Sequence, residues 1–306
     1  MDARGKHADR QWLEISVYHP PEVAEAVAAY LFECGASALS LEEDSQDPAQ
    51  WVSTAGFKAH PGQDHPATDL PAFLVTLADI FDLPEPPRWL RRQVPQGDWA
   101  EKWKEGLSPI EIGPSLVVKP TWCEYTPRPG QKIIELDPGL AFGTGRHATT
   151  YMCLEALERF CRPSDRTGLR ILDLGTGSGI LALAAAALGQ THIIAVDVDP
   201  EAIRVAAENV ALAGAGSSIT LACSGSEALT GHFDLILANL TAADLKQVSP
   251  DLARLSAPGA TLILSGILDD QAEDLARHYA GSGFEILERL SGDEWRTFIL
   301  KRGLPE

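Results

Sequence analysis

Hydrophobic positions along this chain repeat in two ways, and the two patterns alternate over its larger, C-terminal part. Short apolar runs recur between longer segments whose apolar residues stand three or four positions apart. The first pattern is typical of buried strands and the second of amphipathic helices. Strands and helices that alternate through short connections predict a doubly wound, mostly parallel α/β sheet, which binds ligands at the carboxyl ends of its strands.

The alternation predicts one large domain over residues 113–306. Its strands are expected at 170–174, 192–196, 218–222, 233–238 and 261–265, followed by a closing antiparallel pair at 284–290 and 297–301. Its helices are expected at 151–160, 180–188, 200–213, 242–255 and 269–279.

The N-terminal part has a different order of elements and predicts a separate, small domain over residues 1–95. The expected order is a strand at 12–17, a helix at 21–34, a strand at 38–41, a loop-rich stretch at 43–69, a helix at 71–81 and a strand at 88–95. This order predicts a small α+β sandwich of the split β-α-β, ferredoxin-like kind. Because it contains no glycine-rich cofactor loop, we interpret it as a substrate-recognition domain, with a purely structural role as the alternative.

Two tryptophans mark the segment that connects these domains, an expected linker helix over residues 96–112. Trp99 and Trp103 are four positions apart, so both indoles lie on the same side of a helix. Such a helix either packs its aromatic face on one domain or fixes the orientation of the recognition domain over the active site.

One segment carries a strong signal for a nucleotide-like cofactor. An apolar strand that ends near Asp173 runs into a glycine-rich turn over 175–179, and an apolar helix follows. Glycines such as Gly175 and Gly177 allow the backbone to approach a ligand closely. Asp197 ends the next strand at the spacing of roughly 20 residues that is typical of a carboxylate accepting the ribose hydroxyls. We therefore expect all four residues to bind the cofactor.

The charge of this loop favours S-adenosylmethionine (AdoMet) over NAD. A phosphate-binding loop carries a third glycine at the place that Ile180 occupies here. Asp173 also places a negative charge where a pyrophosphate sits, and this charge suits the cationic sulfonium of AdoMet better than an anion. An NAD-dependent dehydrogenase is therefore the weaker alternative.

A polar residue, Asn239, ends another apolar strand of the sheet. By the switch-point rule this strand end lies near the cofactor loop. The amide carbonyl of Asn239 can accept an N–H of a substrate amine and aim the nitrogen lone pair at a methyl group. We expect Asn239 to be the catalytic residue, with a turn-forming asparagine as the alternative. Residues 240–242 follow without an aromatic side chain to stack on a base, which favours a flexible amine as the substrate.

A loop with glycines and a proline precedes the first helix of the large domain, over residues 136–150. We expect it to fold over the cofactor and to contribute contacts from Phe142 and Thr144. Thr149 or Thr150 is expected to cap the helix that follows, because threonine oxygens accept from the free N–H groups of a first turn.

Histidine and cysteine positions give no indication of a metal site. His147 is interpreted as a hydrogen-bonding residue, with a catalytic base as the alternative. No second histidine or carboxylate stands beside it at a metal-ligand spacing. The five cysteines are scattered and form no C-x-x-C pair or Cys/His cluster, so neither disulfides nor structural zinc are expected.

The charge balance limits the partners. The chain has 43 acidic and 25 basic side chains and a net charge of −18. Phosphate backbones require a basic surface, so we expect no direct DNA binding and consider a basic protein the better partner. Acidity that serves only solubility is the alternative. No apolar run approaches the roughly 20 residues that cross a bilayer, and no signal core begins the chain, so we expect a cytoplasmic protein without membrane contact. We also expect a monomer.

Together these segments resemble the bacterial ribosomal protein L11 methyltransferase family (PrmA-type). The similarity covers the N-terminal domain, the tryptophan-containing linker, the loops 136–150 and 173–179, Asn239 and the segment 265–268. The loop 136–150 is the most specific part, since generic methyltransferases lack it. Family members commonly carry Thr and Pro where this chain has Arg146 and Ala148.

The resemblance implies a class I AdoMet-dependent methyltransferase with a Rossmann-like sheet. It implies AdoMet contacts at Thr150, Gly175, Asp197 and Asn239. It also implies that the N-terminal domain binds ribosomal protein L11, free or on the ribosome, while the linker presents several amines in turn. The products would be trimethylated lysines and a trimethylated N-terminal amine. The alternatives are an AdoMet-dependent methyltransferase of another basic protein or small amine, and a non-catalytic binding protein with the same fold.

Overall fold

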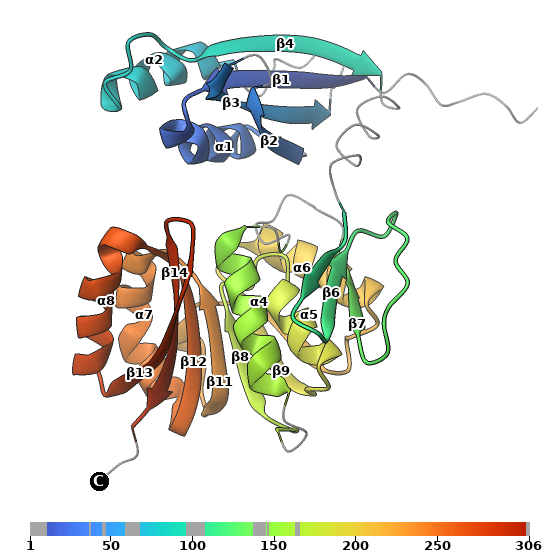
Figure 1. The fold of residues 1–306 in the computed structure, drawn as a ribbon, viewed down its shortest axis with the longest axis vertical. Coiled ribbons are helices and arrows are strands. Elements are labelled where there is room, and N and C mark those ends of the chain that lie inside the picture. Colours follow the sequence, from blue (N-terminus) through green and yellow to red (C-terminus); the bar gives the residue numbers. More distant parts are fainter. Residues whose placement is uncertain are drawn as a thin grey trace, which may run out of the picture. The chain divides into compact units, whose positions relative to one another are not determined.

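The chain divides into two units, Met1–Leu107 and Ser108–Glu306 (Figure 1). A computed structural model describes residues 11–36, 38–44, 47–58, 68–95, 108–136, 145, 147–162 and 166–303. Trp99 and Trp103 of the expected linker lie outside these residues, so a linker helix stays a prediction for residues 96–107. Its expected end is wrong, because residues 108–112 are not helical. Phe142 and Thr144 of the expected cofactor loop also lie outside them.

A four-stranded antiparallel sheet forms the smaller unit (Figure 1). Its elements are β1 (Gln11–His19), η1 (Pro21–Val23), α1 (Ala24–Glu33), β2 (Ala38–Asp44), β3 (Asp47–Lys58), α2 (Leu70–Ile80) and β4 (Arg88–Pro95). The strand order is β2-β3-β1-β4, and each neighbouring pair is antiparallel. The succession β-α-β-β-α-β is that of the split β-α-β motif.

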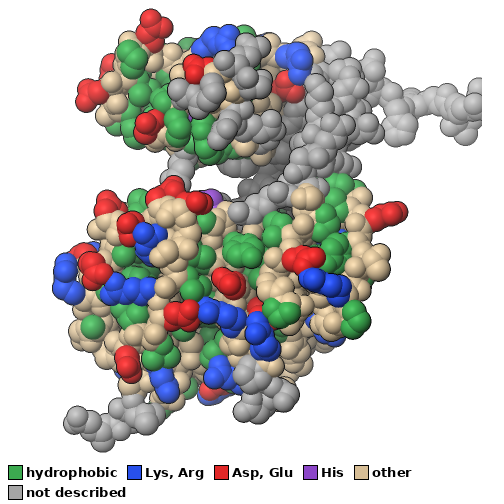
Figure 2. Space-filling model, viewed as in Figure 1, with side chains coloured by type: hydrophobic (Ala, Val, Ile, Leu, Met, Phe, Trp, Pro, Cys, Tyr) green, Lys and Arg blue, Asp and Glu red, His purple; other side chains and the backbone are tan. Residues whose placement is uncertain are grey.

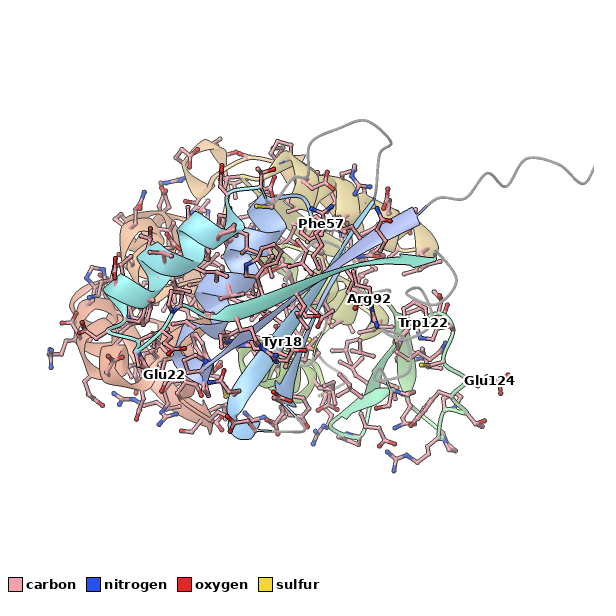
Figure 3. The ribbon with its side chains drawn as sticks, turned by 90° about the horizontal axis from the view of Figure 1, so that it is seen from above. Tyr18, Glu22, Phe57, Arg92, Trp122 and Glu124 are labelled. Carbon is pink, nitrogen blue, oxygen red and sulfur yellow. The ribbon has the colours of Figure 1, made fainter. Side chains whose placement is uncertain are left out.

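Alternation in β1 determines which face of this sheet is buried. Every second side chain packs in one cluster with α1 and α2: Leu13, Ile15 and Val17. The intervening side chains point to the opposite face, because successive strand residues alternate. On that face the Arg88 guanidinium stacks on the Tyr18 ring at 4.0 Å, and Arg92 pairs with Glu14 at 2.6 Å. Figure 3 labels Tyr18 and Arg92 on the two neighbouring strands.

The expectation of a loop-rich stretch over 43–69 is wrong, because β3 lies within it. Asp47 and Gly56 are poor strand formers, and they hid the strand from the sequence pattern. In the structure β3 pairs with β2 on one side and with β1 on the other. Hydrogen bonds along both edges, together with the burial of Ala55 and Phe57, stabilise a segment of low intrinsic strand propensity.

A seven-stranded sheet forms the larger unit, in the order β10-β9-β8-β11-β12-β14-β13. The strands are β8 (Arg170–Leu174), β9 (His192–Asp197), β10 (Ile219–Cys223), β11 (Phe233–Asn239), β12 (Ser256–Leu268), β13 (Phe284–Gly292) and β14 (Trp295–Arg302). The first five strands in the spatial order are parallel, and β14 and β13 close the sheet in antiparallel fashion. The expected doubly wound sheet is confirmed, with β12 extending beyond both ends of the predicted strand.

Helices cover both faces of this sheet (Figure 1). They are α4 (Ala148–Cys161), α5 (Ile180–Ala187), α6 (Pro200–Leu212), α7 (Ala242–Leu255) and α8 (Asp269–Gly281), with a short η2 (Ser226–Ala228). Neighbouring residues of β8 pack on opposite faces of the sheet. Ile171 packs in the cluster of α4 and α5, whereas Leu172 packs in the cluster of α7 and α8. Burial on both sides explains why the central strands are apolar throughout rather than alternating.

The sequence pattern missed a small three-stranded sheet at the start of the larger unit. It consists of β5 (Ile110–Ile112), β6 (Leu116–Lys119) and β7 (Lys132–Glu135), in that order. These strands are too short for their periodicity to be recognised. Ile112, Leu116 and Val118 are buried in the same cluster as α4 and α5, so this sheet extends the core of the larger unit.

The surface of the larger unit carries charges of both signs. Lys and Arg side chains lie between Asp and Glu side chains on the face shown in Figure 2. Arg159 pairs with Glu288 at 3.0 Å on this unit, and Arg204 pairs with Glu201 at 2.6 Å. Among the described residues, no helix is both long enough and apolar enough to cross a membrane.

Candidate active site

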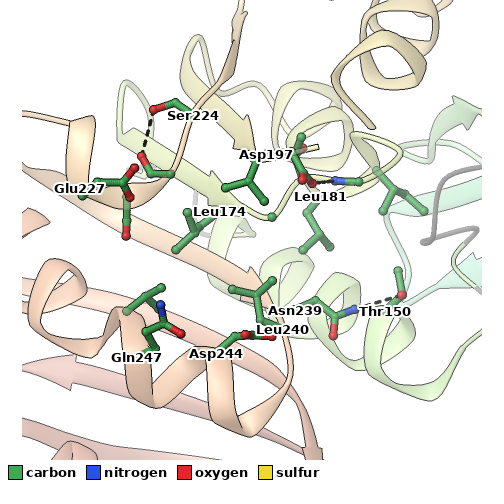
Figure 4. Close-up of a pocket in the computed structure, with 18 residues that line it drawn as sticks. Thr150, Leu174, Leu181, Asp197, Ser224, Glu227, Asn239, Leu240, Asp244 and Gln247 are labelled. Carbon is green, nitrogen blue, oxygen red and sulfur yellow. Dashed lines mark hydrogen bonds between the residues drawn. The ribbon is translucent and has the colours of Figure 1, made fainter. Parts of the chain in front are cut away.

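Four strands of the parallel sheet end at one cavity of about 490 Å³ (Figure 4). β8 contributes Leu174 and the loop that follows it, β9 contributes Asp197, and β11 contributes Asn239. The loop after β10 contributes Ser224. This position, at the carboxyl edge where the sequence pattern predicts a ligand, is the usual binding site of doubly wound sheets.

The glycine-rich loop after β8 has a backbone that side chains disfavour. Gly175, Gly177 and Gly179 have φ angles of +71°, +53° and +83°. At Gly175 space is also short, because a Cβ atom would lie 2.5 Å from the Cδ2 atom of Leu240. The loop therefore needs glycine both for its left-handed conformation and for its contact with the residue that follows Asn239.

Asp173 lies beneath this loop rather than among the cavity-lining residues, and its side chain is almost completely buried. Its Oδ2 atom accepts from Thr176 Oγ1 at 2.6 Å and from the Ala182 N–H at 3.1 Å. Its Oδ1 atom has no hydrogen-bond partner among the described residues. Burial raises the pKa of Asp173 to about 6, and the nearby charge of Asp197 acts in the same direction, against the lowering effect of the two hydrogen bonds.

Asp197 is held at the edge of the cavity by two backbone groups. Its Oδ2 atom accepts from the Gly177 N–H at 2.9 Å, and its Oδ1 atom accepts from the Asp199 N–H at 3.0 Å. Asp199 in turn caps α6 by accepting from the Glu201 N–H at 2.9 Å. A carboxylate has about four acceptor sites. Asp197 therefore keeps acceptor capacity for the hydroxyl groups of a ligand.

Asn239 faces the start of α4 at the other side of the cavity. Its Nδ2 atom donates to Thr149 Oγ1 and to Thr150 Oγ1, both at 3.2 Å, and Figure 4 shows the bond to Thr150. Both amide hydrogens are used in this way. No described residue donates a hydrogen bond to Oδ1, so this oxygen remains available as an acceptor.

The expected cap of α4 is wrong. The helix begins at Ala148, and its N-cap is His147, whose Nδ1 atom accepts from the Thr149 N–H at 3.4 Å. Thr149 and Thr150 lie in the first turn instead, because the imidazole occupies the capping position that a threonine oxygen was expected to fill. Their hydroxyls are thereby free to reach Asn239. The interpretation of His147 as a hydrogen-bonding residue is confirmed by its 2.7 Å contact with Thr149 Oγ1.

The structure thus brings together most of the residues expected at the site. Those that line the cavity are Thr150, Gly175, Gly177, Asp197 and Asn239. The sequence analysis missed Ser224 and Glu227 after β10, and Asp244 and Gln247 on α7. The rule that located Asn239 would also have located Ser224, because Ser224 likewise follows a strand of the parallel sheet. No comparable signal marks the residues of α7.

The cavity fits the AdoMet that the sequence predicts. Its volume lies in the range of small-molecule sites, roughly 300–1,000 Å³. Leu174, Val198 and Leu240 give the cavity an apolar lining that suits a base, and Asp197 has acceptor capacity that suits ribose hydroxyls. The unpaired Oδ1 of Asp173 adds a buried acceptor and a negative charge below the loop. Within the described parts of the chain, no group of three His, Cys, Asp or Glu side chains gathers at a distance suited to a metal ion.

Known proteins resemble this chain over nearly its whole length. The family described as "Ribosomal protein L11 methyltransferase (PrmA)" matches residues 11–303. A protein of Geobacter sulfurreducens named ribosomal protein L11 methyltransferase is 38% identical over 308 residues, which cover 96% of this chain and 99% of the relative. A protein of the same name from Pelotomaculum thermopropionicum is 36% identical and covers 93% of this chain and 97% of its own length.

A solved structure supports the same relationship. The crystal structure of a ribosomal protein L11 methylase from Lactobacillus delbrueckii subsp. bulgaricus matches with a TM-score of 0.59 and 34% sequence identity. The match covers 64% of this chain and 98% of that one.

Proposed function

The chain belongs to the ribosomal protein L11 methyltransferase family, and from this premise we propose that it methylates lysine ε-amines and the N-terminal α-amine of ribosomal protein L11. It is an AdoMet-dependent methyltransferase with a Rossmann-like catalytic unit. The orientation of the Asn239 amide is the observation that supports an amine substrate. Its two hydrogens are bonded to two threonine hydroxyls, and its oxygen remains an open acceptor beside the cavity.

We assign the cofactor to the residues that line the glycine-loop side of the cavity. Asp197 offers acceptors to the ribose hydroxyls, and the backbone of Gly175 and Gly177 permits a close approach of the ligand. Thr150 lines the other side, next to Asn239. Asp173 supports the loop from below, and its buried charge favours a cationic ligand. We assign Phe142 and Thr144 to the cofactor as well, because the loop 136–150 that carries them is expected to fold over it.

The role of the protein in catalysis is to orient a neutral amine. AdoMet held by these residues would supply a methyl group on a positively charged sulfur, which a neutral amine nitrogen can accept through its lone pair. A lysine amine with a pKa of about 10.4 must first lose its proton to water, which costs roughly 4–5 kcal/mol at pH 7. Burial beside a positive charge lowers this cost. Asn239 Oδ1 accepts an N–H of the neutral amine and holds its lone pair in the direction of attack.

The proposed partner suits the charge of the chain. A net charge of −18 favours a basic protein over a nucleic acid. We assign recognition of ribosomal protein L11, free or bound to the ribosome, to the N-terminal unit, which contributes no described residue to the cavity. We further propose that the protein acts as a monomer in the cytoplasm, where this substrate is made.

A methyl-transfer assay tests this proposal. The full chain is incubated with labelled AdoMet and purified ribosomal protein L11, and the intact mass of the product is recorded. We expect mass gains in whole methyl increments. The matched control is L11 with its lysines changed to arginine and its N-terminus acetylated, which should gain no mass. If native L11 gains no mass while AdoMet still binds, the substrate assignment is wrong and the alternative is methylation of another basic protein or small amine.

A further inference from the structure

We propose that His147 acts through the Thr149 hydroxyl to determine which end of the Asn239 amide faces the substrate amine. The chain of contacts from His147 through Thr149 to Asn239 is called the amide relay below. The role of the relay in methyl transfer rests on the proposed function. The assignment of donors and acceptors within the relay does not. Thr149 is a positioning residue in this account, and so is His147.

The amide relay is needed because threonine hydroxyls alone leave the amide orientation undetermined. A hydroxyl both donates and accepts, and an asparagine amide has a donor end and an acceptor end. Thr149 and Thr150 could therefore bind either end of Asn239 from their places in the first turn of α4. Another group has to force one of the hydroxyls to act as an acceptor toward Asn239.

His147 supplies this constraint. Its Nδ1 atom accepts from the Thr149 N–H at 3.4 Å, so Nδ1 carries no hydrogen. The same Nδ1 atom lies 2.7 Å from Thr149 Oγ1, and the hydroxyl must therefore donate to it. Thr149 Oγ1 then has only lone pairs left for Asn239, which fixes the amide with Nδ2 toward Thr149 at 3.2 Å and Oδ1 away from it.

The relay is held by packing on both sides. The His147 ring meets the Trp295 ring edge to face, with centroids 5.2 Å apart. The Thr149 carbonyl accepts from Ser265 Oγ at 3.2 Å, and Ser265 is paired in register with Asn239 across β11 and β12. Ser265 also bonds to Thr297 Oγ1 at 2.6 Å, and these hydroxyl residues are buried. The first turn of α4 is thus fixed to the strand that carries Asn239.

The orientation of the amide has a direct chemical consequence. With Oδ1 exposed to the cavity, Asn239 accepts an N–H of the amine and leaves the nitrogen lone pair free to attack. With Nδ2 exposed, the amide would donate a hydrogen bond to that lone pair and block it. Reversal of one side chain would therefore convert a productive contact into an inhibitory one, without any change in the cavity itself.

Two pairs of matched variants of the full chain test the relay. His147→Asn keeps a capping acceptor near the position of Nδ1, whereas His147→Phe keeps a ring against Trp295 and removes the acceptor. Thr149→Ser keeps the hydroxyl, and Thr149→Val keeps the shape without it. We expect kcat to fall about 100-fold in His147→Phe and Thr149→Val, because misplacement at a reacting centre has effects of this size. The other two variants should stay within about fivefold of wild type, and the AdoMet Kd within about threefold in all four.

An NMR measurement tests the relay without any methyl transfer. The neutral imidazole of His147 should be the tautomer with hydrogen on Nε2, and its ¹⁵N signals are identified by their loss in His147→Asn. A hydrogen on Nδ1 would contradict the relay. Full activity of His147→Phe would also contradict it, and so would an equal loss of activity in His147→Asn and His147→Phe. Failure of wild type to methylate ribosomal protein L11 overturns only the proposed substrate, because the tautomer is measured on the protein alone.

Discussion

The two sides of the cavity are built from different parts of the chain. On the β8–β9 side, the loop of Gly175 and Gly177 presents backbone to the cavity and is held by hydrogen bonds to Asp173 and Asp197. On the β11–β12 side, the polar atoms belong to side chains, and Asn239 meets Thr149 from 90 positions away in sequence. The shape of the first side is determined by its backbone conformation. The function of the second side is determined by which of its side-chain atoms donate hydrogen bonds and which accept them. Substitutions should therefore affect cofactor binding on one side and turnover on the other.

The largest effect is expected at a glycine on the side-chain side. Gly266 has a φ of +84°, and a Cβ atom there would lie 2.2 Å from the Leu240 carbonyl oxygen. Because this neighbour is backbone, Gly266→Ala should displace the end of β11 and cost about 2–4 kcal/mol of unfolding free energy, with a loss of turnover. Gly175→Ala meets only a flexible leucine side chain and should cost about 1–2 kcal/mol. Chemical denaturation of both variants measures the difference, and an equal loss would contradict the distinction between the two neighbours.

A smaller effect, limited to the cofactor, is expected at Asp197. Asp197→Ala removes the acceptor for the Gly177 and Asp199 N–H groups and the acceptor that we propose for the ribose hydroxyls, so the AdoMet Kd should rise about 30- to 100-fold. Isothermal titration calorimetry measures this rise. Asp199→Ala is the matched control, because it removes the cap of α6 without removing a cavity-lining carboxylate. Equal weakening of AdoMet binding by the two variants would assign the effect to α6 rather than to the ribose contact.

The sequence predicted the two sides of the cavity unequally. The strands β8 and β9, the glycine loop and Asp197 follow one another within a short stretch, so local pattern and spacing were sufficient. Asn239 was located by the rule for strand ends, but its partners were not, because no local pattern relates a helix start to a strand so distant in sequence. The same limit applies to β3, whose stability comes from strands on both sides rather than from its own residues. His147 was missed as a cap because threonine is the more common capping residue.

A pH dependence is expected on the backbone side. The pKa of Asp173 is raised from 3.8 to about 6 by burial. The folded state therefore binds the proton more tightly than the unfolded state, and this group lowers the stability as pH rises from about 4 to 6, by about 3 kcal/mol at most. The AdoMet affinity should move the other way and increase through pH 6, because the ionised carboxylate favours a cation.

Asp173→Asn isolates this contribution. The amide keeps an acceptor for Thr176 and for the Ala182 N–H but does not titrate. Wild type should lose stability relative to Asp173→Asn between pH 4 and 6, and only wild type should gain AdoMet affinity near pH 6. Urea unfolding and AdoMet titration over pH 4–8 measure both quantities. Parallel curves for the two proteins would show that Asp173 does not carry the effect.

Asn239→Ala is the most direct test of whether one side of the cavity serves cofactor binding and the other serves turnover. We predict that turnover with the amine substrate falls at least about 100-fold, while the AdoMet Kd stays within about fivefold of wild type. Single-turnover kinetics and AdoMet titration on the same protein sample measure both values. Unchanged turnover would mean that Asn239 only forms the turn after β11. A loss of AdoMet binding as large as the loss of turnover would place Asn239 with the cofactor rather than with the amine.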